Sequence, residues 1–188
     1  MMFRNTSNSY GAVAKLLHWS SFLLILLMYK LGWTAEAMSL SPQKIALIGW
    51  HKSVGITVLT IILLRLLWKV TNPSPALPAH MGRMQIMAAQ GAHWLLYLLV
   101  LAMPLSGWMM SSAAGLRVSV FGWVTLPALI APNRALAHTL REAHGVIAWV
   151  LLSVVTLHIL AALFHHFYYK DTVLKRMLPC TSSNGQKP

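Results

Sequence analysis

The chain has 188 residues, of which 57% are hydrophobic and only 10% are charged. Soluble domains carry roughly a quarter of charged residues, so this composition excludes an ordinary soluble domain and favours a helical bundle surrounded by lipid. The formal net charge is +12, but the basic residues flank apolar runs, which favours membrane anchoring over nucleic-acid binding.

Four apolar runs are each about 20 residues or longer, which is the length needed to cross the hydrocarbon core of a bilayer. The predicted spans are 15–33, 45–68, 91–111 and 143–169. Their ends carry the aromatic residues typical of membrane interfaces: Trp19, Trp33, Trp50, Trp68, Trp94, Trp108, Tyr168 and Tyr169. The sequence therefore predicts an all-α membrane protein, a four-transmembrane-helix bundle, with no internal repeat of fixed period.

The connections between the spans differ in kind. Residues 71–90 begin proline-rich and continue as a short amphipathic piece, and residues 112–142 form the longest loop. Within that loop we expect residues 121–127 to lie at the membrane interface and residues 134–144 to form a short helix leading into the fourth span. The tail after Lys170 holds Cys180, the one cysteine, and we expect it to be disordered.

The placement of Lys and Arg predicts the orientation. Nine lie on the side of the termini: Arg4, Lys15, Arg65, Lys69, Arg83, Lys170, Lys175, Arg176 and Lys187. Six lie on the other side: Lys30, Lys44, Lys52, Arg117, Arg134 and Arg141. The positive-inside rule then gives a cytoplasmic segment 1–14, a transmembrane domain 15–170 and a cytoplasmic tail 171–188.

Histidines inside the apolar spans indicate a functional site, because an ionisable side chain is costly there. The spacing of His144 and His158 is close to four turns and about 21 Å along a helix, so they share one face. Because successive helices alternate in direction, His51 should lie at the depth of His144, and His18 at the depth of His158. The result is two pairs of imidazoles at matched depths.

Two facing imidazoles suit the axial positions of a haem iron, whereas zinc usually takes three or four protein ligands. The absence of a C-x-x-C-H motif makes the predicted cofactors two non-covalent b-type haems. Gly55 and Gly145 would allow close approach of the macrocycle. One such histidine could equally be a satisfied core residue or a proton relay, but four at two depths favour a common role.

Two further groups of residues are candidates for binding. His93, His165 and Lys170, on the cytoplasmic side, are candidates for a quinone site. The alternatives are propionate binding or helix packing for His93 and interfacial anchoring for His165. On the outer side Lys52, Arg117, Arg134 and Arg141 would attract a small anion, unless they pair with lipid phosphates or haem propionates.

The chain resembles the bacterial cytochrome b561 family, which groups with the membrane cytochrome b subunits of nickel-iron hydrogenases. The resembling segments are LLHWSSFLL, WHKSVGI, RLLWKVTNPSP, AHWLLYLLVLAMPLSGW, REAHGVIAWV, LHILAALFHHFYYKD and KDTVLKRMLP. The resemblance implies a four-helix, di-haem b protein of the bacterial inner membrane. It also implies that the axial ligands are His18, His51, His144 and His158.

One known member is a superoxide oxidase, which passes the electrons of superoxide to ubiquinone. Other members are quinone-linked electron carriers for partner dehydrogenases. We therefore expect an oxidoreductase that takes single electrons from superoxide, or another periplasmic donor, at the haem of His51 and His144. The haem of His18 and His158 would pass them to ubiquinone. The alternatives are a carrier subunit without its own substrate turnover and, from another class, a haem-free transporter.

Overall fold

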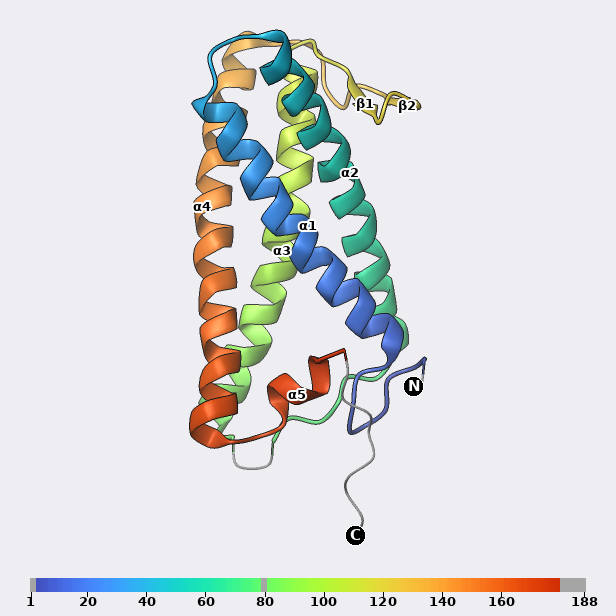
Figure 1. Ribbon diagram of the computed structural model, residues 1–188, viewed down its shortest axis with the longest axis vertical. Helices are drawn as coiled ribbons and strands as arrows, with labels where there is room; N and C mark the ends of the chain where they lie inside the picture. The colour runs from blue at the N-terminus through green and yellow to red at the C-terminus, as the bar shows by residue number, and fades with distance from the viewer. Residues whose placement is uncertain (1–2, 79–80, 180–188) are drawn as a thin grey trace.

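The computed structural model describes residues 3–78 and 81–179, and within them four long helices run alternately up and down (Figure 1). They are α1 Ala12–Ala37, α2 Pro42–Thr71, α3 Arg83–Ala113 and α4 Arg134–Phe164. α1 packs most extensively against α2, and α3 against α4, so the bundle consists of two helical hairpins. In this part of the chain all four helices are long and apolar enough to cross a membrane, which confirms the predicted fold class.

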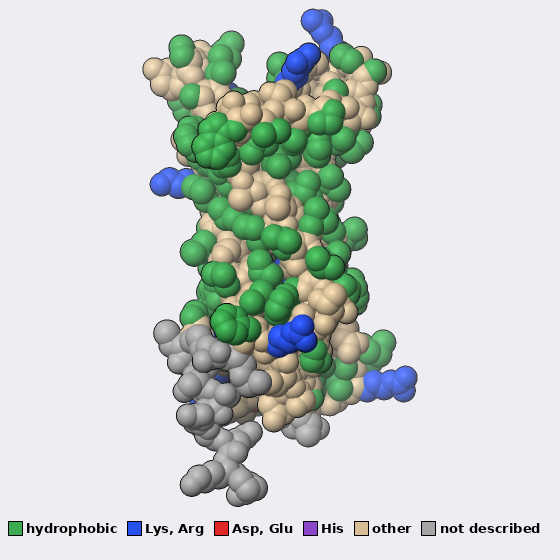
Figure 2. Space-filling view, turned by 90° about the vertical axis from the view of Figure 1, so that its right-hand side faces the viewer, with side chains coloured by type: hydrophobic (Ala, Val, Ile, Leu, Met, Phe, Trp, Pro, Cys, Tyr) green, Lys and Arg blue, Asp and Glu red, His purple; other side chains and the backbone are tan. Residues whose placement is uncertain are grey.

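The bundle is apolar on its outside as well as in its centre. A small core joins Val58 and Ile62 of α2 to Leu99 of α3 and Leu151 of α4. Large side chains such as Leu157 are nevertheless 65% exposed. Figure 2 shows apolar side chains over the middle of one face, with Lys and Arg toward its two ends. Such a surface is favourable in contact with lipid, as expected of a multi-pass membrane protein.

Each helix begins before its predicted span, and the first three also end beyond it. α4 ends at Phe164, and a π-helical turn, η1 His165–Tyr169, covers the rest of the fourth predicted span. Residues 134–144, which were expected to be a short helix leading into the fourth span, form the first turns of α4. Asn133 caps this start, since its side chain accepts the Leu136 N–H at 3.0 Å. The amphipathic piece after the prolines is likewise the beginning of α3.

The long loop between α3 and α4 contains a small β-hairpin. Strands β1 Val118–Val120 and β2 Val124–Leu126 pair antiparallel. Ser53 of α2 is buried and accepts the Phe121 N–H at 2.9 Å, which docks the turn on α2. We call this end of the bundle the hairpin end and the opposite end, where the chain begins, the terminal end (Figure 1).

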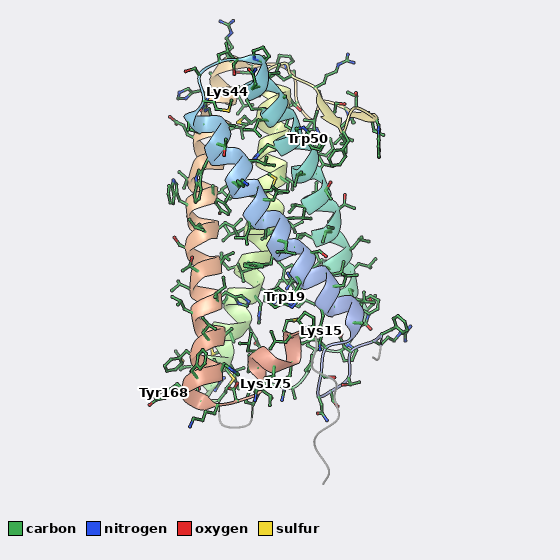
Figure 3. All side chains as sticks on the ribbon, viewed as in Figure 1. Lys15, Trp19, Lys44, Trp50, Tyr168 and Lys175 are labelled. Carbon is green, nitrogen blue, oxygen red and sulfur yellow. The ribbon has the colours of Figure 1, made fainter. Side chains whose placement is uncertain are left out.

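The terminal end is closed by the C-terminal part of the chain. After α4 the chain forms a π-helical turn, η1 His165–Tyr169, and then α5 Val173–Met177. Trp19 of α1 donates its indole N–H to the Met177 carbonyl at 2.9 Å, and Figure 3 shows Trp19 and Lys175 at this end. The expectation of a disordered tail is therefore wrong for residues 173–177. Cys180 and the residues after it lie outside the described part.

Asp171 anchors this C-terminal segment, and its removal should release α5. Its carboxylate lies 2.6 Å from His165 Nδ1 and accepts the Val173 N–H at 3.0 Å. Asp171→Ala leaves these groups unpaired, at a cost of about 1–3 kcal/mol. We expect faster trypsin cleavage at Lys175 and Arg176. Thr172→Ala, which removes an exposed contact with Arg176, is the control; equal cleavage of both variants would contradict the anchoring role.

Candidate functional site

Four histidines meet in two pairs, one toward each end of the bundle. The rings of His51 on α2 and His144 on α4 have centroids 6.4 Å apart. The rings of His18 on α1 and His158 on α4 also have centroids 6.4 Å apart. We call the first the hairpin-end pair and the second the terminal-end pair. The structure thus brings together the residues that the depth argument paired; their role as ligands stays a prediction.

The ring separation tests whether a haem fits between the members of each pair. A metal–imidazole nitrogen bond of about 2.0 Å, with the ring centroid about 1.2 Å further away, puts two axial rings about 6.4 Å apart. Both pairs meet this distance. No group of three or more His, Cys, Asp or Glu side chains among the described residues could hold a metal ion by itself. The pairs therefore suit a metal whose remaining ligands come from a macrocycle.

Each ring of the hairpin-end pair lies against a glycine of the neighbouring helix. A Cβ atom added to Gly32 of α1 would be 3.2 Å from Cε1 of His51. A Cβ atom added to Gly107 of α3 would be 3.2 Å from Cε1 of His144. Both distances are shorter than ordinary contact, so the two glycines form notches that admit the rings.

Hydrogen bonding fixes the tautomer of His144. Ser106 donates its hydroxyl to the Met103 carbonyl at 2.8 Å, and its Oγ is 2.8 Å from Nδ1 of His144. Since the hydroxyl hydrogen is used elsewhere, Nδ1 of His144 donates to Oγ, and the lone pair of Nε2 stays available for a metal. His51 differs, because its buried Nδ1 has no hydrogen-bond partner.

The terminal-end pair has polar neighbours in place of glycines. The Arg65 guanidinium of α2 lies 2.8 Å from Nδ1 of His18. His93 of α3 packs edge-on against His158, with ring centroids 5.4 Å apart. A guanidinium can only donate, so Nδ1 of His18 accepts in this contact. Ligation of a metal through Nε2 of a neutral ring would require Arg65 to leave Nδ1.

Cationic and aromatic side chains surround this terminal-end pair. Arg65 also lies over the ring of Tyr97, at 5.4 Å from its centroid. Lys69, one turn along α2, lies 4.3 Å from the ring of Trp94 and 4.6 Å from that of Tyr97. Tyr10, in the segment before α1, belongs to the same neighbourhood. Burial and then Tyr97 raise its pKa, against the opposing effect of Arg65, so its phenol stays neutral.

The four paired histidines, the two notch glycines, Arg65 and His93 follow one spacing in the sequence. Each long helix carries two of them at the same separation in the sequence: His18 and Gly32, His51 and Arg65, His93 and Gly107, His144 and His158. This separation is about 3.9 turns, so each helix presents one face at both levels. In each helical hairpin the first helix contributes His then Gly, and the second contributes His then a basic or imidazole side chain.

This common plan reveals residues that the sequence analysis missed, namely Gly32, Gly107, Ser106 and Arg65. The sequence did contain a signal for the glycines. The residues His-Trp, Met and Gly-Trp occur in α1 and again in α3, in the same order, with the same spacing and so at one constant offset along the chain. The second helices of the two hairpins, aligned on His51 and His144, have a larger offset, so no single period appears. Gly55 and Gly145, which the sequence analysis named for close approach of a macrocycle, do not face a histidine ring: a Cβ added to Gly55 would meet Met28 at 3.4 Å, and one added to Gly145 has no atom within 4 Å. Their place beside a macrocycle stays a prediction.

The other predicted site residues are more scattered. Arg117 and Arg134 are exposed, Lys52 is half-buried, and Arg141 forms an exposed ion pair with Glu36 at 3.1 Å. Among the quinone candidates His93 lies beside His158, whereas His165 uses its Nδ1 for the ion pair with Asp171. Lys170 follows η1 in a left-handed conformation, with φ of 53°.

Comparison with known proteins places these features in context. A family model described as prokaryotic cytochrome b561 matches residues 9–180. The chain is 36% identical over 192 residues to cytochrome b561 homolog 2 of Escherichia coli (strain K12), covering 98% of both chains. It is 32% identical over 168 residues to the probable superoxide oxidase CybB of Yersinia pestis, covering 87% of this chain and 92% of the relative. It is 28% identical over 176 residues to cytochrome b561 homolog 1 of E. coli, covering 92% and 98%.

Proposed function

This chain belongs to the prokaryotic cytochrome b561 family, a family of membrane electron carriers with b-type haem, and from that premise we propose its specific function. The protein is a di-haem oxidoreductase that oxidises superoxide on the periplasmic side of the bacterial inner membrane and reduces ubiquinone. The observation that most directly supports the two haems of this proposal is the repeated ring separation of 6.4 Å at two levels of the bundle.

Each haem would be held by one pair of histidines, His51 with His144 and His18 with His158. A b-type haem would supply reversible one-electron chemistry there, and binding by two imidazoles would favour electron transfer over binding of a further ligand. The glycine notches and Ser106 would hold the rings at one level. At the other level His93 packs against His158, and Arg65 would have to leave Nδ1 of His18 when the ring binds a metal.

The net reaction balances when two superoxide anions are oxidised for each quinone. Each superoxide gives up one electron and becomes dioxygen, and ubiquinone takes up two electrons and two protons to become ubiquinol. The proposed orientation has both termini in the cytoplasm, so the hairpin end faces the periplasm. His93, His165 and Lys170 remain our candidates for the quinone site at the terminal end.

The printed name of the Yersinia pestis relative, probable superoxide oxidase, supports the choice of substrate. The cationic hairpin end gives a physical reason for it, because Lys52, Arg117 and Arg134 would raise the local concentration of a small anion. Arg141 contributes less, since Glu36 neutralises it.

The decisive experiment is stopped-flow absorbance of the purified, oxidised protein mixed with superoxide. We expect the haem bands to become reduced without any partner protein and to reoxidise when ubiquinone is added. Reduction by an added donor but not by superoxide would overturn superoxide oxidation and favour a carrier subunit. A colourless protein would overturn the di-haem assignment and favour a haem-free transporter.

The rate of reduction by superoxide should fall several-fold as salt is added. Screening shortens the Debye length from about 30 Å at 0.01 M salt to about 8 Å at 0.15 M, which removes long-range attraction. Arg117→Gln and Arg134→Gln should each lower the rate at low salt and flatten this dependence. Arg83→Gln, an exposed arginine at the terminal end, is the matched control. A rate independent of ionic strength would contradict electrostatic steering.

A further inference from the structure

The two levels of the bundle differ in the kind of group that contacts the histidine rings. At the hairpin end the contacts are glycine notches and the Ser106 Oγ, which carry no net charge. At the terminal end they are Arg65, which is always protonated, and the imidazole of His93. The ring separation is the same at both ends, so the difference lies in the surroundings of the pairs and not in their spacing.

From this difference we infer that the chain sets two haem sites at unequal reduction potentials, with the terminal-end site the higher. The inference rests on the proposed function, in which each pair of histidines holds one haem. Such a difference would favour electron transfer from the hairpin end to the terminal end, which is the direction that the proposed function requires. One site is oxidised and the other reduced in that transfer, so a single electron moves and no other reactant is needed.

At the hairpin end, hydrogen bonding favours the oxidised state. Nδ1 of His144 donates to the Ser106 Oγ, and an acceptor at Nδ1 increases the basicity of the ring and its donation to a metal. Stronger donation stabilises the more positive, oxidised metal and lowers the potential. The hydroxyl of Ser106 stays oriented for this role because it donates to the Met103 carbonyl.

At the terminal end, a fixed positive charge favours the reduced state. Arg65 contacts His18 directly and stays charged at every accessible pH. The carboxylates recorded in ion pairs have other partners: Glu36 pairs with Arg141, Glu142 with His138 and Asp171 with His165. Lys69 adds a second cation one turn further along α2. An added electron is therefore stabilised at this end, even when Arg65 has left Nδ1 of His18.

Of the cations at the hairpin end, Lys52 lies nearest in the sequence to a ring of the pair, since it follows His51, and it opposes this gradient. Arg117 and Arg134 also oppose it, but they are exposed and solvent screens their charge. Successive residues are about 100° apart around a helix, so the Lys52 side chain leaves α2 in a different direction from the His51 ring. Arg65, by contrast, lies close to four whole turns from His51 and shares its face of α2. The terminal-end cation is thus aimed into the bundle.

The test is a potentiometric titration of the full-length, haem-loaded protein, followed by absorbance and electron paramagnetic resonance. We expect two one-electron components. Arg65→Leu should lower the higher component alone by about tenfold in the equilibrium constant, which is about 59 mV for one electron. Arg65→Lys keeps the positive charge, so its higher component should stay close to that of the unchanged protein. If Arg65→Leu does not bind haem, Arg65→Gln takes its place in the test. Ser106→Ala should raise the lower component alone, and Ser153→Ala, which loses an exposed helix contact, should move neither.

The outcomes separate this inference from the function on which it rests. If substitution of Arg65 changes neither midpoint potential, or changes the lower one, the gradient is overturned and the di-haem function still stands. One component, with one haem per chain, would overturn both. Assignment comes from His144→Ala: the component that survives belongs to the terminal-end site, and it must be the higher one.

Discussion

Replacing His144 with alanine should reduce the haem content of the purified protein from about two per chain to about one. His144 supplies one of the two rings at the hairpin end, and the terminal-end pair, which uses His18 and His158, stays intact. Alanine has the highest helix propensity, so α4 should persist without the ring. The pyridine haemochrome assay measures the loss.

The pairing itself is tested by comparing variants. His51→Ala and His144→Ala should leave the same residual haem, with the same spectrum and midpoint potential. His18→Ala and His158→Ala should leave the other one. His138→Ala is the control, because His138 is exposed and contacts Glu142 at 3.7 Å, away from both pairs. Different residual haems in His51→Ala and His144→Ala would contradict the pairing.

Replacing Gly107 with leucine should also remove the hairpin-end haem, although Gly107 offers no ligand atom. Even a single added carbon would lie 3.2 Å from Cε1 of His144, so a leucine needs the space that the ring occupies. Overpacking of this kind typically costs about 1–3 kcal/mol. Gly107→Ala is the milder form, in which the ring must shift by a few tenths of an ångström. This variant should change the electron paramagnetic resonance spectrum of the hairpin-end haem and leave the spectrum of the terminal-end haem unchanged.

Two glycines provide matched controls for the notch. Gly91 lies on the same helix as Gly107, and Gly145 is the sequence neighbour of His144; neither has an atom within 4 Å of an added Cβ. Alanine at any of these positions gains about 0.5–1 kcal/mol of helix propensity, so that contribution cancels in the comparison. Gly32→Ala should reproduce the Gly107→Ala effect through His51. An unchanged hairpin-end haem in Gly107→Leu would contradict the notch.

Hydropathy and histidine spacing were enough to predict the bundle, since both signals are local to each span. The spacing of His144 and His158, a nearly whole number of turns, sets their common face whatever the other helices do. The matched depths of His18 and His51 then follow from alternating helix direction. The helix ends were less predictable: residues 134–144 were expected to be helical, but their polar character did not show that they continue into the fourth span as one helix, α4.

The contacts between helices were beyond a single-span argument. Gly55 and Gly145 could be named from their positions beside histidines in the sequence, whereas the glycines that the rings meet, Gly32 and Gly107, lie on neighbouring helices. Which residues face each other depends on the rotation of one helix about another. The repeated His-Trp, Met, Gly-Trp order of α1 and α3 would have indicated it, had the two helices been compared.

The two-hairpin architecture has a consequence for how the protein is assembled. Each pair takes one ring from the α1–α2 hairpin and one from the α3–α4 hairpin, so neither half of the chain would have both of the proposed ligands of a haem. Each bound haem would then link the two helical hairpins, one haem at each level of the bundle. In a newly made chain without haem, the two hairpins should separate before either hairpin unfolds. The supply of haem would therefore determine the lifetime of the folded protein in the membrane.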